Sequence, residues 1–178
     1  MTAISSRFDT FCALLHSATP QALDMVEEKL KAKKLTHEEF VECLAMLDEA
    51  IGDGVLVYGD RYKLHALLLK VLEHKPESPF ALSRLGVLLQ HSDSMQGEIY
   101  LNDALIINPS DSYALAHLGE YYITNKPTKA KELLEQAVQL NPEYLFAQEL
   151  LGVVYGILSK QCLAKALELS TCGQQKAE

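Results

Sequence analysis

Residues 112–142 read SYALAHLGEYYITNKPTKAKELLEQAVQLNP and contain two apolar-patterned segments separated by a short polar turn. In the second segment the apolar residues recur every three or four positions, which is the spacing of one helix face. Asn141-Pro142 closes the stretch, because a proline ring removes a backbone donor and keeps the preceding residue out of the helical region. The stretch therefore predicts two helices, over roughly 112–124 and 127–140, joined as a hairpin.

The same pattern recurs on both sides of this stretch at a period of 33 residues. Five columns of similar residues share the register: Pro76, Pro109 and Pro142; Gly86, Gly119 and Gly152; Ala81, Ala114 and Ala147; Leu85, Leu118 and Leu151; Phe80, Tyr113 and Phe146. Leu68, Leu101, Leu134 and Leu167 extend it to four copies. Repeats are therefore predicted at 79–109, 112–142 and 145–170, after a degenerate half-repeat at 60–76.

Each repeat is predicted to contain two helices. The first helices span 79–91, 112–124 and 143–158, and the second span 94–107, 127–140 and 160–170. Glycine inside a helix costs about 1 kcal/mol relative to alanine, so a glycine column requires a structural reason. We expect the two helices of each hairpin to approach closely there.

The central repeat resembles the tetratricopeptide repeat, a helix-turn-helix unit with a recurring signature. The matching residues are Leu115, Leu118-Gly119, Tyr122, Ala130, Leu134, Ala137 and Pro142. Several features depart from the family pattern. The period is one shorter than the usual length of about 34, the chain has no Trp, and the turns between helices lack glycine. The third copy also has Gln148, Leu163 and Ser170 at signature positions. The resemblance implies an all-α fold, an α-α superhelix of helical hairpins with N-terminal capping helices.

Residues 1–59 precede the repeats and are predicted to form further helices at 4–16, 20–33 and 37–51. Thr36 to Glu39 has the form of a capping box, and 55–59 suggests a brief extended connection. Two roles stay open for this region. The helices cap the end of the array, or an apolar face forms a homodimer through Phe8, Phe11, Leu14 and Leu15.

Composition and motifs exclude several classes of function. The chain has 24 acidic and 16 basic residues and a formal charge of −8, which argues against a nucleic-acid partner. No uninterrupted run of about 18 apolar residues is present, so no membrane-spanning helix is expected. The four cysteines form no Cys-x-x-Cys pair and the histidines are scattered, so we expect reduced thiols, no metal and no cofactor. With no catalytic motif, the sequence predicts a cytoplasmic protein that is not an enzyme.

The resemblance implies a concave surface, lined by the first helix of each repeat, that binds peptides or partner segments. Carried over by register, the lining residues are Phe80, Ser83 and Val87; Tyr113, Ala116 and Glu120; and Phe146, Glu149 and Val153. Relatives that bind the C-terminal carboxylate of heat-shock chaperones use Lys, Arg and Asn in this groove, and that clamp is not expected here.

An apolar, weakly acidic groove would instead suit a segment with hydrophobic anchors and one basic residue. The alternative is that the aromatic column only packs between neighbouring repeats. The principal hypothesis is a protein-protein interaction module or scaffold. Two other readings stay open: a small chaperone for secreted proteins, loosely similar to class II chaperones of bacterial type III secretion, and a structural subunit of a fixed complex or homo-oligomer.

Overall fold

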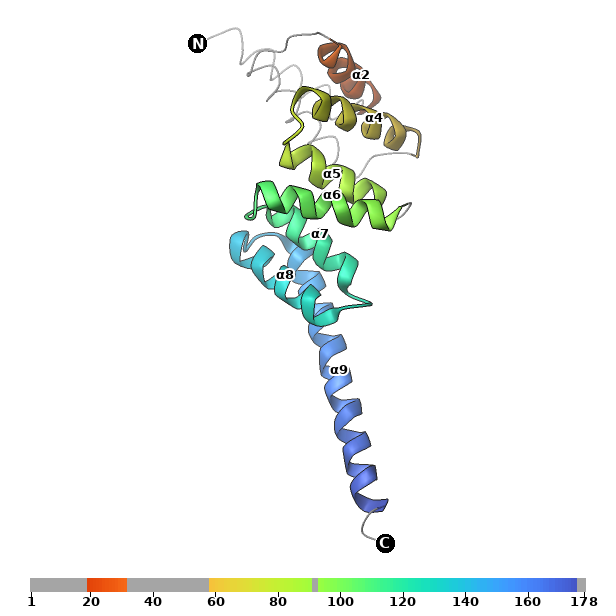
Figure 1. Cartoon of the computed structure of the whole chain (residues 1–178), viewed down its shortest axis with the longest axis vertical. Helices are drawn as coiled ribbons and strands as arrows, with labels where there is room; N and C mark the ends of the chain where they lie inside the picture. Colours follow the sequence, from red (N-terminus) through yellow and green to blue (C-terminus); the bar gives the residue numbers. More distant parts are fainter. Residues whose placement is uncertain (1–18, 32–57, 91–92, 176–178) are drawn as a thin grey trace. The chain divides into compact units, whose positions relative to one another are not determined.

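The structure is a computed structural model that describes residues 19–31, 58–90 and 93–175. All regular structure in these ranges is helical (Figure 1). The helices are α2 (Thr19–Leu30), α4 (Tyr58–His74), α5 (Pro79–Leu89), α6 (Ser94–Ile107), α7 (Ser112–Tyr122), α8 (Pro127–Leu140) and α9 (Leu145–Gln175). They belong to two compact units, residues 1–88 and 89–178.

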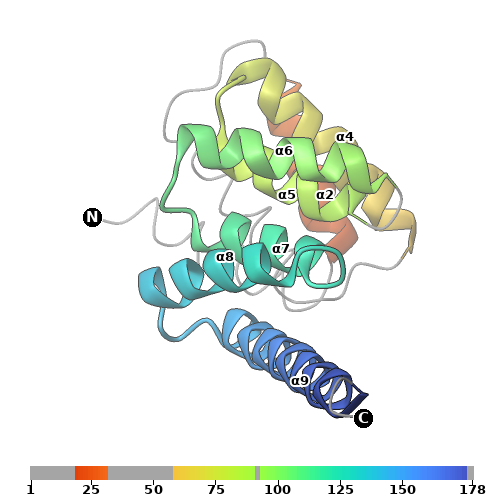
Figure 2. The same cartoon turned by 60° about the horizontal axis from the view of Figure 1, so that its bottom comes forward.

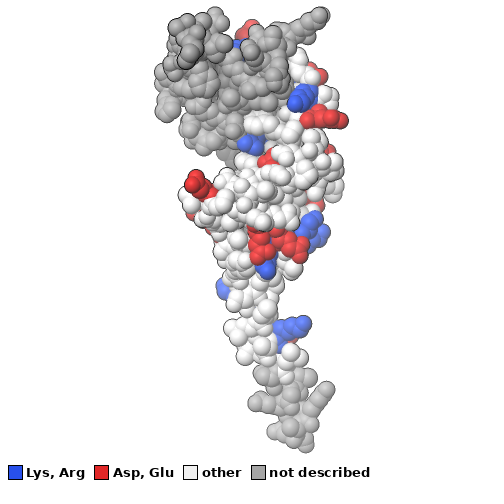
Figure 3. All heavy atoms as spheres, turned by 90° about the vertical axis from the view of Figure 1, so that its left-hand side faces the viewer, with Lys and Arg blue, Asp and Glu red and all other residues white. Residues whose placement is uncertain are grey.

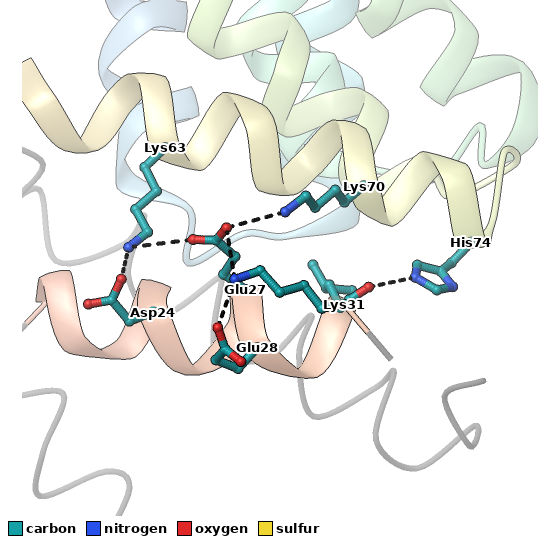
Figure 4. Close-up of polar contacts among 8 residues, drawn as sticks. Asp24, Glu27, Glu28, Lys31, Lys63, Lys70 and His74 are labelled. Atoms are coloured by element: carbon teal, nitrogen blue, oxygen red, sulfur yellow. Dashed lines mark hydrogen bonds and ion pairs between the residues drawn. The ribbon is translucent and has the colours of Figure 1, made fainter. Parts of the chain in front are cut away.

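In the first unit, α2 and α4 lie side by side. The buried apolar residues of the two helices are Val26 and Leu30 on α2 and Leu64, Leu67, Leu68 and Val71 on α4. Figure 4 shows the polar edge of the pair, where Glu27 lies between Lys63 and Lys70. The Lys70 Nζ atom is 3.4 Å from the Glu27 carboxylate, and this hydrogen bond, with the charge of nearby Lys31, lowers the pKa of Glu27.

In the second unit, α6, α7, α8 and the first part of α9 follow one another, each packed beside the previous helix (Figure 2). The starts of the helices have local causes. Asp93 Oδ1 accepts a hydrogen bond from the backbone N–H of Gln96 at the start of α6, and Asp111 caps α7 in the same way. Pro127 occupies the first turn of α8, where its missing donor costs nothing.

The bounds of α6, α7 and α8 confirm the helices predicted over 94–107, 112–124 and 127–140 to within two residues. The reason given for the glycine column is also confirmed at its central member. A Cβ atom placed on Gly119 would be 2.7 Å from Leu134 Cγ and 3.0 Å from Leu134 Cδ2, inside the normal carbon-carbon contact distance. A side chain at 119 would therefore hold α7 and α8 apart.

The third repeat differs from the prediction. α9 is one continuous helix from Leu145 to Gln175, so the expected break between 143–158 and 160–170 is wrong. The earlier turn reads Thr124-Asn125-Lys126-Pro127, whereas the corresponding positions read Ile157-Leu158-Ser159-Lys160. Apolar helix formers without a proline favour continuation of the helix.

α9 also bears on the expectation about membranes, which stays a prediction. Over Leu145–Leu169 it is long and apolar enough to cross a bilayer, by length and composition alone, and it is the one such helix in the described ranges. Within this helix Glu149 and Lys160 divide the apolar residues, so they form no uninterrupted run of about 18.

Several N-terminal predictions lie outside the described residues: the helices at 4–16 and 37–51, and the proposed contact face of Phe8, Phe11, Leu14 and Leu15. The helix predicted at 20–33 corresponds to α2. The extended connection predicted at 55–59 is wrong at its end, since α4 already begins at Tyr58. The division at residue 59 stays a prediction.

Candidate partner-binding face

Three rings from α7 and α9 form the centre of the candidate face. The ring centroids of Tyr113 and His117 are 4.4 Å apart, and those of His117 and Phe146 are 4.7 Å apart. Tyr144 adds a fourth ring, 5.9 Å from that of Phe146. The aromatic residues of two successive repeats are therefore joined through a histidine, and each ring remains partly exposed. We call Tyr113, His117 and Phe146 the aromatic face.

A carboxylate borders the aromatic face and is held in place by two polar neighbours. Glu120 Oε2 accepts a hydrogen bond from Gln90 Nε2 at 3.2 Å and lies 3.2 Å from His117 Nδ1. Because a carboxylate only accepts hydrogen bonds, Nδ1 of His117 carries the proton in this contact. The arrangement orients the imidazole ring and leaves Glu120 about one-third exposed.

The other predicted lining residues are distributed unevenly. In the second unit, Glu149 is exposed and Val153 is 52% exposed on α9, while Ala116 is fully buried. In the first unit, Ser83 is fully buried, and Phe80 and Val87 are partly exposed on α5. Ser83 and Ala116 therefore offer no accessible surface to a partner.

Sequence reasoning missed two residues of this set. His117 is one of six histidines scattered through the sequence, yet its spacing of four from Tyr113 and three from Glu120 places all three on one helix face. Arg84 was also missed: its guanidinium lies over the Phe80 ring, 4.7 Å from the centroid, one turn along α5. The spacing of four between Phe80 and Arg84 was the available signal.

Tyrosine–carboxylate pairs join neighbouring helices away from the aromatic face. The Tyr122 hydroxyl of α7 donates to Glu98 of α6, and the Tyr155 hydroxyl of α9 donates to Glu135 of α8 at 2.6 Å. Burial of the Tyr122 ring, followed by its bond to Glu98, raises the pKa of Tyr122 to about 12. These contacts link each first helix to the preceding repeat, so they serve the packing of the array.

The described side chains do not provide a metal site: no group of three or more His, Cys, Asp or Glu among them is arranged to hold an ion. Of the cysteines, Cys162 is exposed on α9 and is not in a disulfide. We find no arrangement of nucleophile and base among the contacts described above.

Comparison with solved structures identifies the architecture. The structure of MamA residues 41 to the end from Desulfovibrio magneticus RS-1 matches with a TM-score of 0.61 and 20% identity, covering 97% of this chain and 94% of that one. The first TPR of Spaghetti (RPAP3), bound to the HSP90 peptide SRMEEVD, matches with a TM-score of 0.56 and 15% identity, covering 72% of this chain and 99% of that one. The chain has a tetratricopeptide-repeat fold.

A third match shows how far the likeness extends. An O-GlcNAc transferase from Thermobaculum terrenum aligns with a TM-score of 0.57 and 22% identity, over 68% of this chain but only 23% of the transferase. No protein-family model matches the sequence. At these identities the tetratricopeptide-repeat fold is what the comparisons establish.

Proposed function

We propose that this tetratricopeptide-repeat chain is a non-catalytic module that binds a segment of a partner protein on the aromatic face. The observation that carries the proposal is the cluster of Tyr113, His117 and Phe146, whose rings are partly exposed at the junction of two repeats. Aromatic side chains supply much of the binding energy at protein interfaces because they bury a large area while losing few rotatable bonds. Packing between repeats also positions these rings, so the two roles suggested by the sequence are compatible.

Charge around the aromatic face favours a segment that carries a basic residue beside an apolar anchor. Glu120 borders the rings on α7, and Glu149 and the half-exposed Val153 follow Phe146 along α9. A carboxylate near a buried anchor attracts a lysine or arginine and disfavours an acidic group. The RPAP3 structure contains an acidic peptide, so we expect the opposite charge preference here.

The test is a selection of random displayed peptides on the immobilised full chain, followed by calorimetric measurement of Kd for the selected synthetic peptides. Replacement of a central interface aromatic by alanine often weakens binding by more than about tenfold. We expect such a loss for Phe146→Ala and for Tyr113→Ala. Tyr62→Ala is the matched control, because Tyr62 is 82% exposed on α4, in the other unit.

Two results would contradict the proposal. Equal affinity of the Phe146→Ala and Tyr62→Ala variants would place binding elsewhere. Tight binding of the peptide SRMEEVD, used as an acidic probe, would refute the charge preference. The roles of secretion chaperone and fixed structural subunit, and the cytoplasmic location, stay predictions.

A further inference from the structure

α9 contains both halves of a repeat hairpin without the turn between them. In the second repeat, Leu134 of α8 fills the space above Gly119 of α7. Fifteen residues separate this pair, and fifteen residues also separate Gly152 and Leu167. Because α9 is straight, Gly152 and Leu167 lie more than four helical turns apart along one helix and do not meet.

The face of α9 that carries Gly152 and Gly156 is exposed, whereas the corresponding face of α7 is covered by packing. A Cβ atom placed on Gly152 or Gly156 would meet nothing within 4 Å outside its own helix backbone. On α7 the corresponding face is covered, since Leu118 and Tyr122 are 2% and 3% exposed. On α9 the residue matching Tyr122 is Tyr155, which is 47% exposed.

The leucine half of α9 is likewise uncovered. Leu163 and Leu167 are 62% and 59% exposed, and both lie on one face of the helix. The opposite face carries Gln161, Lys165 and Glu168. In Figure 3 the part of α9 that continues beyond α7 and α8 shows mostly uncharged surface with isolated basic side chains. Lys160 lies on the same face as Leu163 and Leu167, one turn before Leu163. The exposed leucines of this face favour an apolar partner surface.

We propose that two copies of the chain pair through antiparallel α9 helices, so that Leu163 and Leu167 of one copy pack on Gly156 and Gly152 of the other. The contact would repeat, between chains, the packing of Leu134 on Gly119 within the chain. It is self-complementary, because each copy supplies one glycine face and one leucine face about a two-fold axis near Ser159 and Lys160. The inference does not depend on the proposed function.

A second copy fits α9 better than a lipid bilayer does. Ala147 and Val154 are fully buried in the second unit, so the first part of α9 is already packed on its own chain. The exposed remainder, Tyr155–Leu169, is shorter than the roughly 20 apolar residues needed to span a membrane. It also includes Lys160, Lys165 and Glu168, which a bilayer core would exclude.

The first measurement is the mass of the full wild-type chain by light scattering over a wide range of concentrations. The expected mass is twice the 19.8 kDa of one chain. A single-chain mass at all concentrations would overturn the proposal, and it is the result expected if α9 folds back into a hairpin within one chain. Flotation of the chain with phosphatidylcholine vesicles, in place of a soluble dimer, would overturn it in favour of a membrane contact.

Three variants then test which residues form the interface. Leu167→Glu should weaken the dimer by at least about tenfold, while Leu169→Glu should leave it unchanged. Leu169 is the matched control because it is 68% exposed on the same helix but lies outside the leucine face. Gly152→Leu should leave the helicity unchanged, because nothing in the chain lies within 4 Å of a Cβ atom placed on Gly152. It should also yield a monomer, because the new side chain occupies the space that a leucine of the second copy requires.

Equal effects of Leu167→Glu and Leu169→Glu would overturn the assignment of the face. A dimer that persists in both Leu167→Glu and Gly152→Leu would overturn the proposal as a whole. Loss of helicity in Gly152→Leu would contradict the open space at this glycine, and the Leu167→Glu comparison would still decide the interface.

Discussion

The close contact of α7 and α8 predicts an unusual response to one added methyl group at Gly119. In an exposed helix, glycine to alanine stabilises by about 1 kcal/mol. At Gly119 the new Cβ atom would be 2.7 Å from Leu134 Cγ, which is a branch point rather than the flexible end of the side chain. Leu134 is fully buried and has little room to move away. Added carbons in a packed core typically cost about 1–3 kcal/mol, so Gly119→Ala should destabilise the chain by a net amount of about 1 kcal/mol.

A double-mutant cycle isolates the contact. Leu134→Ala alone should cost about 2–5 kcal/mol, because it removes a buried side chain. In that background Gly119→Ala meets no leucine and should recover its helix-propensity gain of about 1 kcal/mol. The effect of the substitution at Gly119 therefore changes sign, and the coupling energy between the two sites should be about 2 kcal/mol.

The assay is urea unfolding followed by far-ultraviolet circular dichroism, with all variants at one protein concentration so that association does not alter the comparison. If Gly119→Ala stabilised the wild-type chain by as much as it stabilises an exposed helix, the close approach of α7 and α8 would be refuted. A coupling energy near zero would lead to the same conclusion.

Three further predictions concern single groups. The hydrogen bond from Lys70, with nearby positive charge, lowers the pKa of Glu27 from its usual value of 4.5. The stability that this pair contributes should therefore be present above pH 4.5 and be lost as the pH falls through the lowered pKa. Lys70→Met should flatten that part of the acid unfolding curve. Burial and its hydrogen bond raise the pKa of Tyr122 to about 12, so stability should decline as pH rises from 10 to about 12, and Tyr122→Phe should reduce this decline in alkaline unfolding. In a Leu167→Glu background, Gly152→Ala should stabilise the chain by up to about 1 kcal/mol in urea unfolding, because the added methyl group meets open space.

The 33-residue register predicted the hairpins because the residues of its columns set both the ends of the helices and the contacts between them. Pro127 begins one helix, Asn141-Pro142 ends it, and Gly119 marks the close contact between the pair. Each of these signals acts within one repeat, and therefore it can be recognised without knowledge of the neighbouring repeats.

The register did not predict the course of the third repeat. Matching leucine and glycine columns imply a hairpin, but whether the chain turns depends on the few residues between the columns. Ile157-Leu158 favours helix where Thr124-Asn125 and Pro127 favour a turn, and this local preference determined α9. A repeat alignment weights the columns and overlooks such connecting residues.

The candidate site was predicted in part. The rings of Tyr113 and Phe146, which share a column of the register, both contact His117. His117 belongs to no column of the 33-residue register, so the register does not indicate it. Register alone points to Ser83 and Ala116, but register does not indicate which small side chains are completely buried, as these two are.

The central claim is that a partner segment binds across α7 and the start of α9. The most direct test is hydrogen–deuterium exchange of the full chain, with and without a saturating peptide obtained from the display selection. The account predicts added protection at residues 113–120 of α7 and 146–153 of α9, around Tyr113, His117 and Phe146, with none at Tyr62 on α4. Protection confined to α6 or to the outer side of α8 would contradict it.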